Sequence, residues 1–228
     1  MRSIQSDCNL PGELRIWAWD GFKANQRRRN IFPDYKVRRK PAPNEFYKTI
    51  EQIKKMIQHT NALQIEVEGY EADDVIATIV ASWPRTEPVH IMSTDRDLQP
   101  LRLLPNVTTS QTNKPGVMPH EVQLYKTLVG DSSDSIPGLP GFGEKSWERC
   151  NKVQMKELIF GQRDRLQVEG LSSRTLNWLA DVNNLKLLRS MWNCIALLDV
   201  PQDQITRNLR PGVRDDVAAM KIMSEFLQ

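Results

Sequence analysis

Runs of apolar residues at two different spacings predict an α/β fold. Side chains alternate over residues 14–19 and 64–68, and residues 89–94 form a short apolar run, as is typical of strands. Residues 45–60 and 72–80 carry apolar side chains at the three- and four-residue spacing of an amphipathic helix. Because helices that alternate with strands connect parallel strands, we expect a mostly parallel central sheet flanked by helices.

Weaker patterns extend the prediction toward the C-terminus. Residues 98–104 indicate a short helix that ends at Pro105, residues 106–110 a strand, and residues 120–129 a further helix. Residues 150–228 carry leucines at helical spacing and no constellation of catalytic side chains. The pattern therefore predicts an α/β core followed by a helical lobe.

Acidic residues stand where the predicted strands end. Asp20 directly follows the first strand, and Asp95 and Asp97 follow the apolar run at 89–94. Ligands bind beyond the carboxyl ends of parallel strands, and residues two apart on an extended chain point to the same side. These three carboxylates are therefore candidates for one shared site.

Two further acidic groups change how the cluster is interpreted. Glu71, Asp73 and Asp74 open the apolar helix, where the ordinary explanation is stabilisation by the helix dipole. Asp131 and Asp134 lie one helical turn apart. If all these groups meet, their mutual repulsion requires a cation, and carboxylate oxygens suit Mg²⁺ or Mn²⁺.

The charge is unevenly distributed along the chain. The net charge is +3, yet residues 23–40 hold eight basic residues against Asp34 alone. Such a run is often only a solvated surface, but here Phe22, Phe32 and Tyr35 are interleaved with it, and aromatic rings can stack on bases. A basic segment beside an acidic pocket suits an enzyme that acts on a polyanion with a bound metal.

A segment rich in glycine and proline follows the last acidic pair. Gly138, Gly141 and Gly143 precede a helix predicted to begin at Lys145, so their backbone N–H groups could hold a phosphate. An ordinary loop remains the alternative.

Other features exclude several classes of protein. Cys8, Cys150 and Cys194 are far apart and indicate reduced thiols rather than a disulfide framework or a zinc site. No apolar run is long enough to cross a membrane, so we expect a cytoplasmic protein without a membrane partner.

Taken together these stretches resemble the 5′-nuclease family, which includes phage flap endonucleases, 5′→3′ exonucleases and the nuclease domain of bacterial DNA polymerase I. The resemblance covers roughly residues 14–150 in the family's order. The motifs that carry it are Trp19-Asp20-Gly21, Arg28 with residues 32–36 and Arg39, Glu71-Ala72-Asp73-Asp74, residues 93–98 and residues 130–143.

The resemblance implies a fold and a domain division. It implies a PIN-like core over residues 14–130, with the basic segment 23–40 inside it. Residues 131–228 would form a helical DNA-binding lobe with a motif like a helix-hairpin-helix. Residues 1–13, broken by Pro11-Gly12, are expected to be poorly ordered.

The resemblance also assigns roles to residues. It implies two divalent ions, Mg²⁺ or Mn²⁺, held by Asp20, Glu71, Asp73, Asp74, Asp95, Asp97, Asp131 and Asp134. It implies catalytic cations at Lys36 and Arg39, and K⁺ at the Gly138–Gly143 turn. DNA contacts would come from Arg28, Arg29, Tyr35, Gly138, Gly141, Gly143 and Lys145.

One departure bears on activity. The family opens with a strand that ends in a metal-binding acid, whereas only thirteen residues precede Leu14 here, and Asp7 follows no apolar run. We expect that the start of the gene is misplaced, that a separate chain supplies the strand, or that the strand is lost. The expected function is Mg²⁺-dependent cleavage of DNA near a 5′ end or flap, in replication or repair in a bacterial or phage-infected cell. The alternative is a catalytically impaired DNA-binding member of the family.

Overall fold

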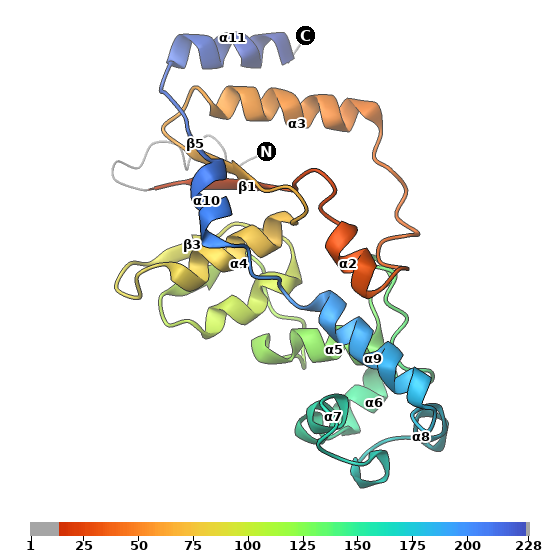
Figure 1. Ribbon diagram of the computed structural model, residues 1–228. Helices are drawn as coiled ribbons and strands as arrows, with labels where there is room; N and C mark the ends of the chain where they lie inside the picture. The colour runs from red at the N-terminus through yellow and green to blue at the C-terminus, as the bar shows by residue number, and fades with distance from the viewer. Residues whose placement is uncertain (1–13, 227–228) are drawn as a thin grey trace.

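The computed structural model describes residues 14–226 (Figure 1). Its strands are β1 (Ile16–Trp19), β2 (Leu63–Glu66), β3 (Val89–Ile91), β4 (Val107–Thr109) and β5 (Leu209–Pro211). Its α-helices are α2 (Gln26–Ile31), α3 (Asn44–Ile57), α4 (Ala72–Ser82), α5 (Val122–Val129), α6 (Glu144–Arg149), α7 (Lys152–Ile159), α8 (Ser173–Trp178), α9 (Val182–Ile195), α10 (Gln202–Asn208) and α11 (Asp216–Phe226). Three 3₁₀-helices complete the described chain: η1 (Arg96–Leu103), η2 (Pro119–Glu121) and η3 (Arg165–Gln167). The predictions made for residues 1–13, and for Cys8 among them, lie outside these residues.

The strands form two small sheets rather than the single sheet expected from the sequence. β1 and β2 pair in parallel, and β5 joins the far edge of β2 in the antiparallel direction. β3 and β4 pair in parallel as a separate sheet. The parallel pairs confirm the α/β prediction, whereas one continuous central sheet is not present in the described part of the chain.

Helix α4 packs against both sheets. Its residue Val75 is fully buried in a cluster with Ile65 of β2, and Val80 is buried with Ile91 of β3. Burying one such side chain contributes about 1.5–3 kcal/mol, so these contacts on two faces fix α4 firmly. The start of α4 is thereby held at one place between the sheets.

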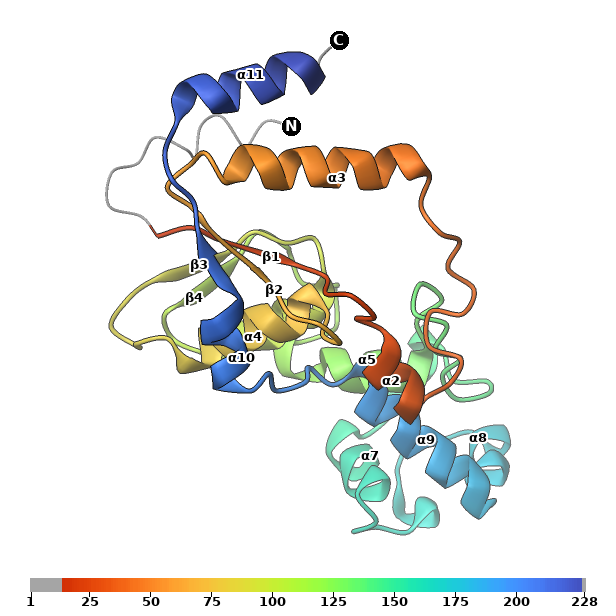
Figure 2. The same cartoon turned by 45° about the horizontal axis from the view of Figure 1, so that its top comes forward.

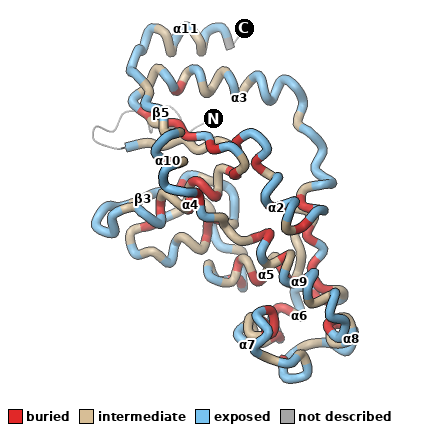
Figure 3. Tube along the Cα trace, viewed as in Figure 1, coloured by how far each residue is buried: buried red, intermediate tan, exposed pale blue. Residues whose placement is uncertain are grey.

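Helix α3 covers the opposite face of the first sheet, and α11 lies alongside α3 (Figure 2). The indole Nε1 of Trp19 donates to Gln64 Oε1 at 3.1 Å, and Gln64 Nε2 donates to the carbonyl of Lys54 in α3 at 3.0 Å. The layers therefore run α11, α3, the first sheet and α4. Many positions along α3 and α11 remain exposed (Figure 3).

The C-terminal region returns to the core, which differs from the division expected at residue 130. β5 extends the first sheet, and the segment after it is tied to the end of α3. Gly212 N donates to Ala62 O at 2.9 Å, and Val213 N donates to Gln58 O at 2.8 Å. Residues 131–228 are therefore not a separate helical lobe throughout.

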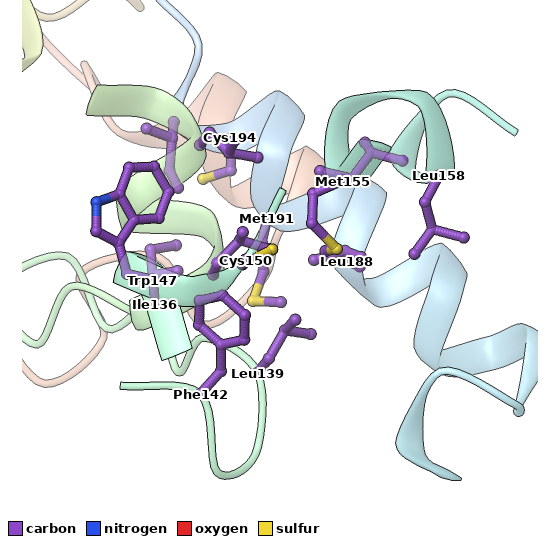
Figure 4. Close-up of a cluster of buried hydrophobic side chains, with 14 of the residues drawn as sticks. Ile136, Leu139, Phe142, Trp147, Cys150, Met155, Leu158, Leu188, Met191 and Cys194 are labelled. Carbon is purple, nitrogen blue, oxygen red and sulfur yellow. The ribbon is translucent and has the colours of Figure 1, made fainter. Parts of the chain in front are cut away.

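The part of this region that does form a lobe has its own apolar core (Figure 4). Leu139 and Phe142 of the glycine-rich loop pack there with Trp147 of α6 and Met191 of α9. Cys150 and Cys194 are unpaired thiols, as the sequence predicts, and burial raises the pKa of Cys194 to about 12. This core joins α5, α6, α7 and α9 into one unit beside the α/β layers.

Two local predictions differ from the structure. The basic segment contains the short helix α2, which the sequence pattern did not reveal, and residues 96–103 form a 3₁₀-helix with Pro100 inside it. The helix expected at Lys145 begins one residue earlier, at Glu144. None of the helices in residues 14–226 is long and apolar enough to span a bilayer.

Candidate metal and nucleic-acid site

Asp20 and the start of α4 are brought together by a close approach of two chain segments. Gly21 N donates to Tyr70 O at 3.0 Å, and a Cβ at Gly21 would lie 1.8 Å from Val67 O. Only glycine fits this crossing. It sets Asp20 at the N-terminus of α4, where Asp20 Oδ1 accepts from Ala72 N at 2.9 Å.

Asp73, in the first turn of α4, lies among carboxylates from three parts of the chain. Burial raises the pKa of Asp73 to about 8, and the neighbouring charges of Asp95, Asp97, Glu71 and Asp20 act in the same direction. The structure therefore brings together acids that follow β1, begin α4 and follow β3.

Glu71 is held by groups from the basic segment. Tyr35 donates its hydroxyl to Glu71 Oε2 at 2.9 Å, and Lys36 donates to Glu71 Oε1. The side chain of Tyr35 is buried, so it cannot stack on a base as the resemblance implied. Burial and the charge of Glu71 raise the pKa of Tyr35, which keeps its hydroxyl protonated.

Arg28 is buried, and it pairs with Asp74 instead of facing solvent. Its Nη1 and Nη2 donate to the two Asp74 oxygens at 2.6 and 2.7 Å, and its Nε donates to Cys194 O at 3.0 Å. Asp74, also buried, accepts from the backbone N–H groups of Glu71 and Leu198. Both Asp74 oxygens are fully used, which differs from the expected metal ligation by Asp74 and DNA contact by Arg28.

Lys126 of α5 was missed by the sequence reasoning. Its Nζ lies 2.6 Å from Asp97 Oδ1 and 2.9 Å from Asp131 Oδ2. Those two charges raise the pKa of Lys126 against the opposing effect of burial. Burial raises the pKa of Asp97 to about 6 even though Lys126 acts against it. The lysine thus neutralises one end of the acidic cluster.

The loop after α5 supplies the last two acids. Asp131 forms a β-bridge with Ile136, and its Oδ1 accepts from the backbone N–H and the hydroxyl of Ser133. Lys36, in the left-handed region at φ 52°, donates its N–H to Asp134 O at 3.0 Å. This bond docks the basic turn onto the acidic loop, and the Lys36 Nζ lies 3.8 Å from Asp134 Oδ1.

A cleft of about 690 Å³ is lined by part of the acidic cluster and by residues of the basic segment. Lys36, Arg39, Asp95 and Asp134 are among its lining residues. Arg39 is exposed, whereas only 13% of the Lys36 side chain is exposed. Cations and carboxylates thus both line the cleft.

The donor set fits a divalent cation by its chemistry. The carboxylate oxygens of Asp20, Asp73 and Asp95 suit Mg²⁺ or Mn²⁺. Burial, and then the charges of the neighbouring carboxylates, raise the pKa of Asp73. Within residues 14–226 no three such side chains converge as they would around an ion. In the arrangement seen, lysine and arginine groups hold Glu71, Asp74, Asp97 and Asp131.

The glycine-rich turn is fixed mainly by packing. Gly138 has φ 70°, and a Cβ there would lie 2.6 Å from the backbone of Val129. Gly141 has φ 76°, whereas Gly143 has open space around it. Lys145 and Arg29 are exposed, as a DNA-contacting role requires.

Comparison with known proteins identifies relatives of this chain. Residues 6–126 match the family described as 5′-3′ exonuclease, N-terminal resolvase-like domain. A 5′-3′ exonuclease of Bacillus subtilis is 32% identical over 228 residues, covering 87% of this chain and 76% of the relative. DNA polymerase I of Caldicellulosiruptor bescii is 32% identical over 164 residues, covering 64% of this chain.

The extent of these matches differs between relatives. The chain spans 19% of the Caldicellulosiruptor polymerase and 48% of a 5′-3′ exonuclease from Halalkalibacterium halodurans, which is 33% identical over 57% of this chain. A solved structure of T5 5′-exonuclease with bound zinc has a TM-score of 0.60 at 20% identity, covering 98% of this chain and 88% of that one. This likeness supports the fold.

Proposed function

The chain belongs to the 5′-3′ exonuclease family, and we propose that it hydrolyses phosphodiester bonds of DNA near a 5′ end or flap with bound Mg²⁺ or Mn²⁺. The observation that carries this proposal is that Asp95, whose charge acts on Asp73 together with that of Asp20, lines a cleft with Lys36 and Arg39. Three of the acids proposed to bind metal (Asp95, Asp131 and Asp134) thus line the same cleft as the cations proposed to bind phosphate.

The proposed chemistry uses both the acids and the cations of the site. A divalent ion at the acids would stabilise the charge that develops on the phosphate oxygens and lower the pKa of bound water. Arg39 is exposed at the cleft and binds the phosphate of the substrate. Lys36 is tied to Glu71 and the Asp134 loop, so its ammonium is oriented before the substrate arrives.

Arg28, Tyr35 and Asp74 act as positioning residues in this proposal. The Arg28–Asp74 pair joins the start of α4 to the end of α9, where helix carbonyls lack partners of their own. Tyr35 fixes one oxygen of Glu71. These buried contacts hold the acids at one edge of the site.

We propose that DNA contacts extend on both sides of the cleft. Arg29 is exposed beside the site, and Lys145 is exposed after the Gly138–Gly143 turn, between α5 and α6. The turn would grip duplex backbone as a helix-hairpin-helix does, with K⁺ bound by its carbonyl groups. Replacing K⁺ by Li⁺ should then speed the dissociation of duplex DNA, and equal dissociation rates in the two salts would contradict this part.

The test of the proposed function is cleavage of a 5′-labelled flap duplex with and without Mg²⁺. Asp95→Asn is expected to lower the rate at least about a hundredfold, because it removes a charge from the metal-binding group. Asp34→Asn is the matched control, since Asp34 is exposed and outside the cluster. Full activity in EDTA, or equal activity of the two variants, would refute the proposal.

A second candidate is a catalytically impaired DNA-binding protein. The observation that favours it is that cations already hold several of the acids and that no three of the described acids converge. This protein would bind flap DNA with an affinity that falls steeply with salt and would not cleave it. Metal-dependent turnover by the purified chain excludes it.

We also propose that the sheets accept another strand. Within the described residues β1 pairs on one side only, and β3 pairs only with β4, while both strands end beside the same acids. A strand lying between them, from this polypeptide or from a separate chain, would join the two sheets. A polypeptide that supplies this strand should raise the Tm of the protein when it is added, and an unchanged Tm would contradict the proposal.

A further inference from the structure

Three aromatic side chains accompany the basic segment, and they differ in whether a ligand can reach them. Phe32 and Tyr35 are 4% and 3% exposed and pack in the lobe core. Phe22, in contrast, is 65% exposed. Of the three rings that the sequence offers for stacking on a base, only Phe22 therefore presents its surface to solvent.

The loop that carries Phe22 has a fixed backbone. This loop, residues 20–25, joins β1 to α2 (Figure 1). Gly21 N donates to Tyr70 O at 3.0 Å. One residue later, Phe22 O accepts from Gly69 N at 2.8 Å. Because the backbone is already held, a ligand that covers the ring has little conformational entropy of the loop to overcome.

Cations surround the exposed ring. The Lys23 Nζ lies 5.1 Å from the centroid of the Phe22 ring, and the Arg27 Cζ lies 4.3 Å from the centroid of the buried Tyr70 ring. Both cations are exposed. Lys23 has φ 54°, a left-handed conformation that is costly for residues other than glycine and is found most often at functional sites. An apolar ring flanked by positive charge suits a nucleotide better than a neutral apolar partner.

The same loop adjoins the proposed active site. Asp20 stands two residues before Phe22, so their Cα atoms are at most about 7.6 Å apart. Tyr70, to which the loop is bonded, directly precedes Glu71. Glu71 in turn accepts from Lys36, which lines the cleft. A nucleotide on the Phe22 ring therefore belongs to a strand that also reaches the cleft.

We propose that Phe22 is a stacking platform for an unpaired base of the DNA next to the scissile phosphate, with Lys23 and Arg27 on the phosphates that flank this base. A base inside a duplex is already stacked on its neighbours, so the ring selects a single-stranded nucleotide. Stacking is tolerant of sequence, because every base has a π-face. This inference rests on the proposed function and adds to it a residue that determines specificity.

The experiment measures the Kd of a 5′-flap duplex by fluorescence anisotropy, in EDTA and in Ca²⁺ to limit cleavage. Phe22→Ala is expected to raise the Kd about 5- to 100-fold, the range that loss of one stacking ring produces. Phe22→Tyr, which keeps a ring, should bind within about twofold of the unchanged protein. Phe160→Ala is the matched control, because Phe160 is also exposed but follows α7 in the lobe, and its Kd should not change.

A flap whose unpaired strand carries abasic nucleotides separates stacking from damage to the fold. The unchanged protein should bind the abasic flap more weakly than the intact flap, by the same factor as Phe22→Ala loses. Phe22→Ala should bind the two flaps equally. Since the unchanged protein is compared on two DNAs, this result does not depend on whether the variant folds.

The outcomes distinguish this inference from the proposed function. Equal affinity of the unchanged protein for the intact and the abasic flap would overturn the stacking role, whatever the flap-cleavage assay shows. The same holds if Phe22→Ala still prefers the intact flap as strongly as the unchanged protein does. Absence of flap binding by the unchanged protein, in both EDTA and Ca²⁺, together with absence of cleavage in Mg²⁺, would overturn both.

Discussion

Arg28 and Arg29 are neighbours in sequence with opposite environments. Arg28 is 3% exposed and bonded to Asp74, whereas Arg29 is exposed and its Nε donates to the carbonyl of Tyr35. The sequence presents both as part of one basic run, so it cannot distinguish a buried structural cation from a surface one. Arg28 lies on the side of the short helix α2 that faces α4 and α9, whereas Arg29 lies on a side that faces solvent.

Replacing Arg28 should therefore cost stability rather than only DNA affinity. Arg28→Met leaves the buried Asp74 carboxylate without its ion pair, which is expected to lower the free energy of unfolding by about 3–5 kcal/mol. Urea unfolding of the variant and of the unchanged protein measures this loss of stability. Arg29→Met, the neighbouring control, should change stability by less than about 0.5 kcal/mol. Equal losses of stability in the two variants would contradict the structural role of Arg28.

Asp73 gives the site a pH dependence in the absence of metal. An acid whose pKa is higher in the folded chain destabilises the fold as pH rises. The cost is absent below the ordinary pKa of about 4 and complete above the folded-state pKa of about 8. Asp73→Asn removes this cost, so we expect it to be more stable than the unchanged protein in EDTA above pH 8, by at most about 5 kcal/mol.

The same comparison includes its own control. The stability difference between Asp73→Asn and the unchanged protein should shrink toward zero below about pH 4, where the carboxyl is protonated in both the folded and the unfolded state. Saturating Mg²⁺ should stabilise the unchanged protein more than Asp73→Asn, because the variant lacks one of the proposed metal-binding carboxylates. The unchanged protein should then be the more stable of the two at pH 8. A stability difference that does not vary with pH would show that the charge of Asp73 is not its cause.

At the scale of elements, the parts that the sequence predicts are those with a strong repeating pattern. Residues 45–60 and 72–80 became α3 and α4 because each has an apolar stripe to bury. β5 was missed because three residues that end in Pro211 carry no alternation. Lys126 was missed because one lysine in an amphipathic helix resembles an ordinary surface residue until its neighbours are placed.

The glycine-rich turn offers a test with two nearby positions. Gly138→Ala forces a left-handed backbone at φ 70° and places a Cβ 2.6 Å from the Val129 backbone, so we expect the free energy of unfolding to fall by about 2–4 kcal/mol. Gly143→Ala has φ −114° and no neighbouring atom within 4 Å, so its stability should stay within about 0.5 kcal/mol. Thermal unfolding of both variants measures these changes. A loss of stability in Gly138→Ala alone would show that close packing of the backbone requires glycine at position 138.

At the scale of the whole molecule, the layered α/β part and the helical lobe meet at the cleft. The fold class follows from the strand and helix patterns of the sequence, and the sequence also marks Asp20 and Asp95 at strand ends and Asp73 at a helix start. The separation of the strands into two sheets could not be predicted from the sequence, because it depends on which strand, if any, pairs with the free edge of β1. The return of β5 to β2 also depends on long-range contacts.

The exposed cations of the basic segment should dominate DNA affinity. Lys23, Arg27, Arg29, Arg38, Arg39 and Lys40 are exposed. Removing one cation that binds a phosphate lowers the slope of log K against log salt by about 0.9. Changing Arg38 and Arg39 to Gln should therefore reduce the slope by about 2, while Arg207→Gln, on α10, leaves it unchanged. An unaltered slope in the double variant would place the DNA elsewhere.

The proposed metal-dependent function is tested most directly by the anomalous scattering of a crystal soaked in Mn²⁺. We expect an anomalous peak beside the carboxylates of Asp20, Asp73 and Asp95. A map without a peak at these acids, in crystals whose cleft is open to solvent, would contradict this arrangement.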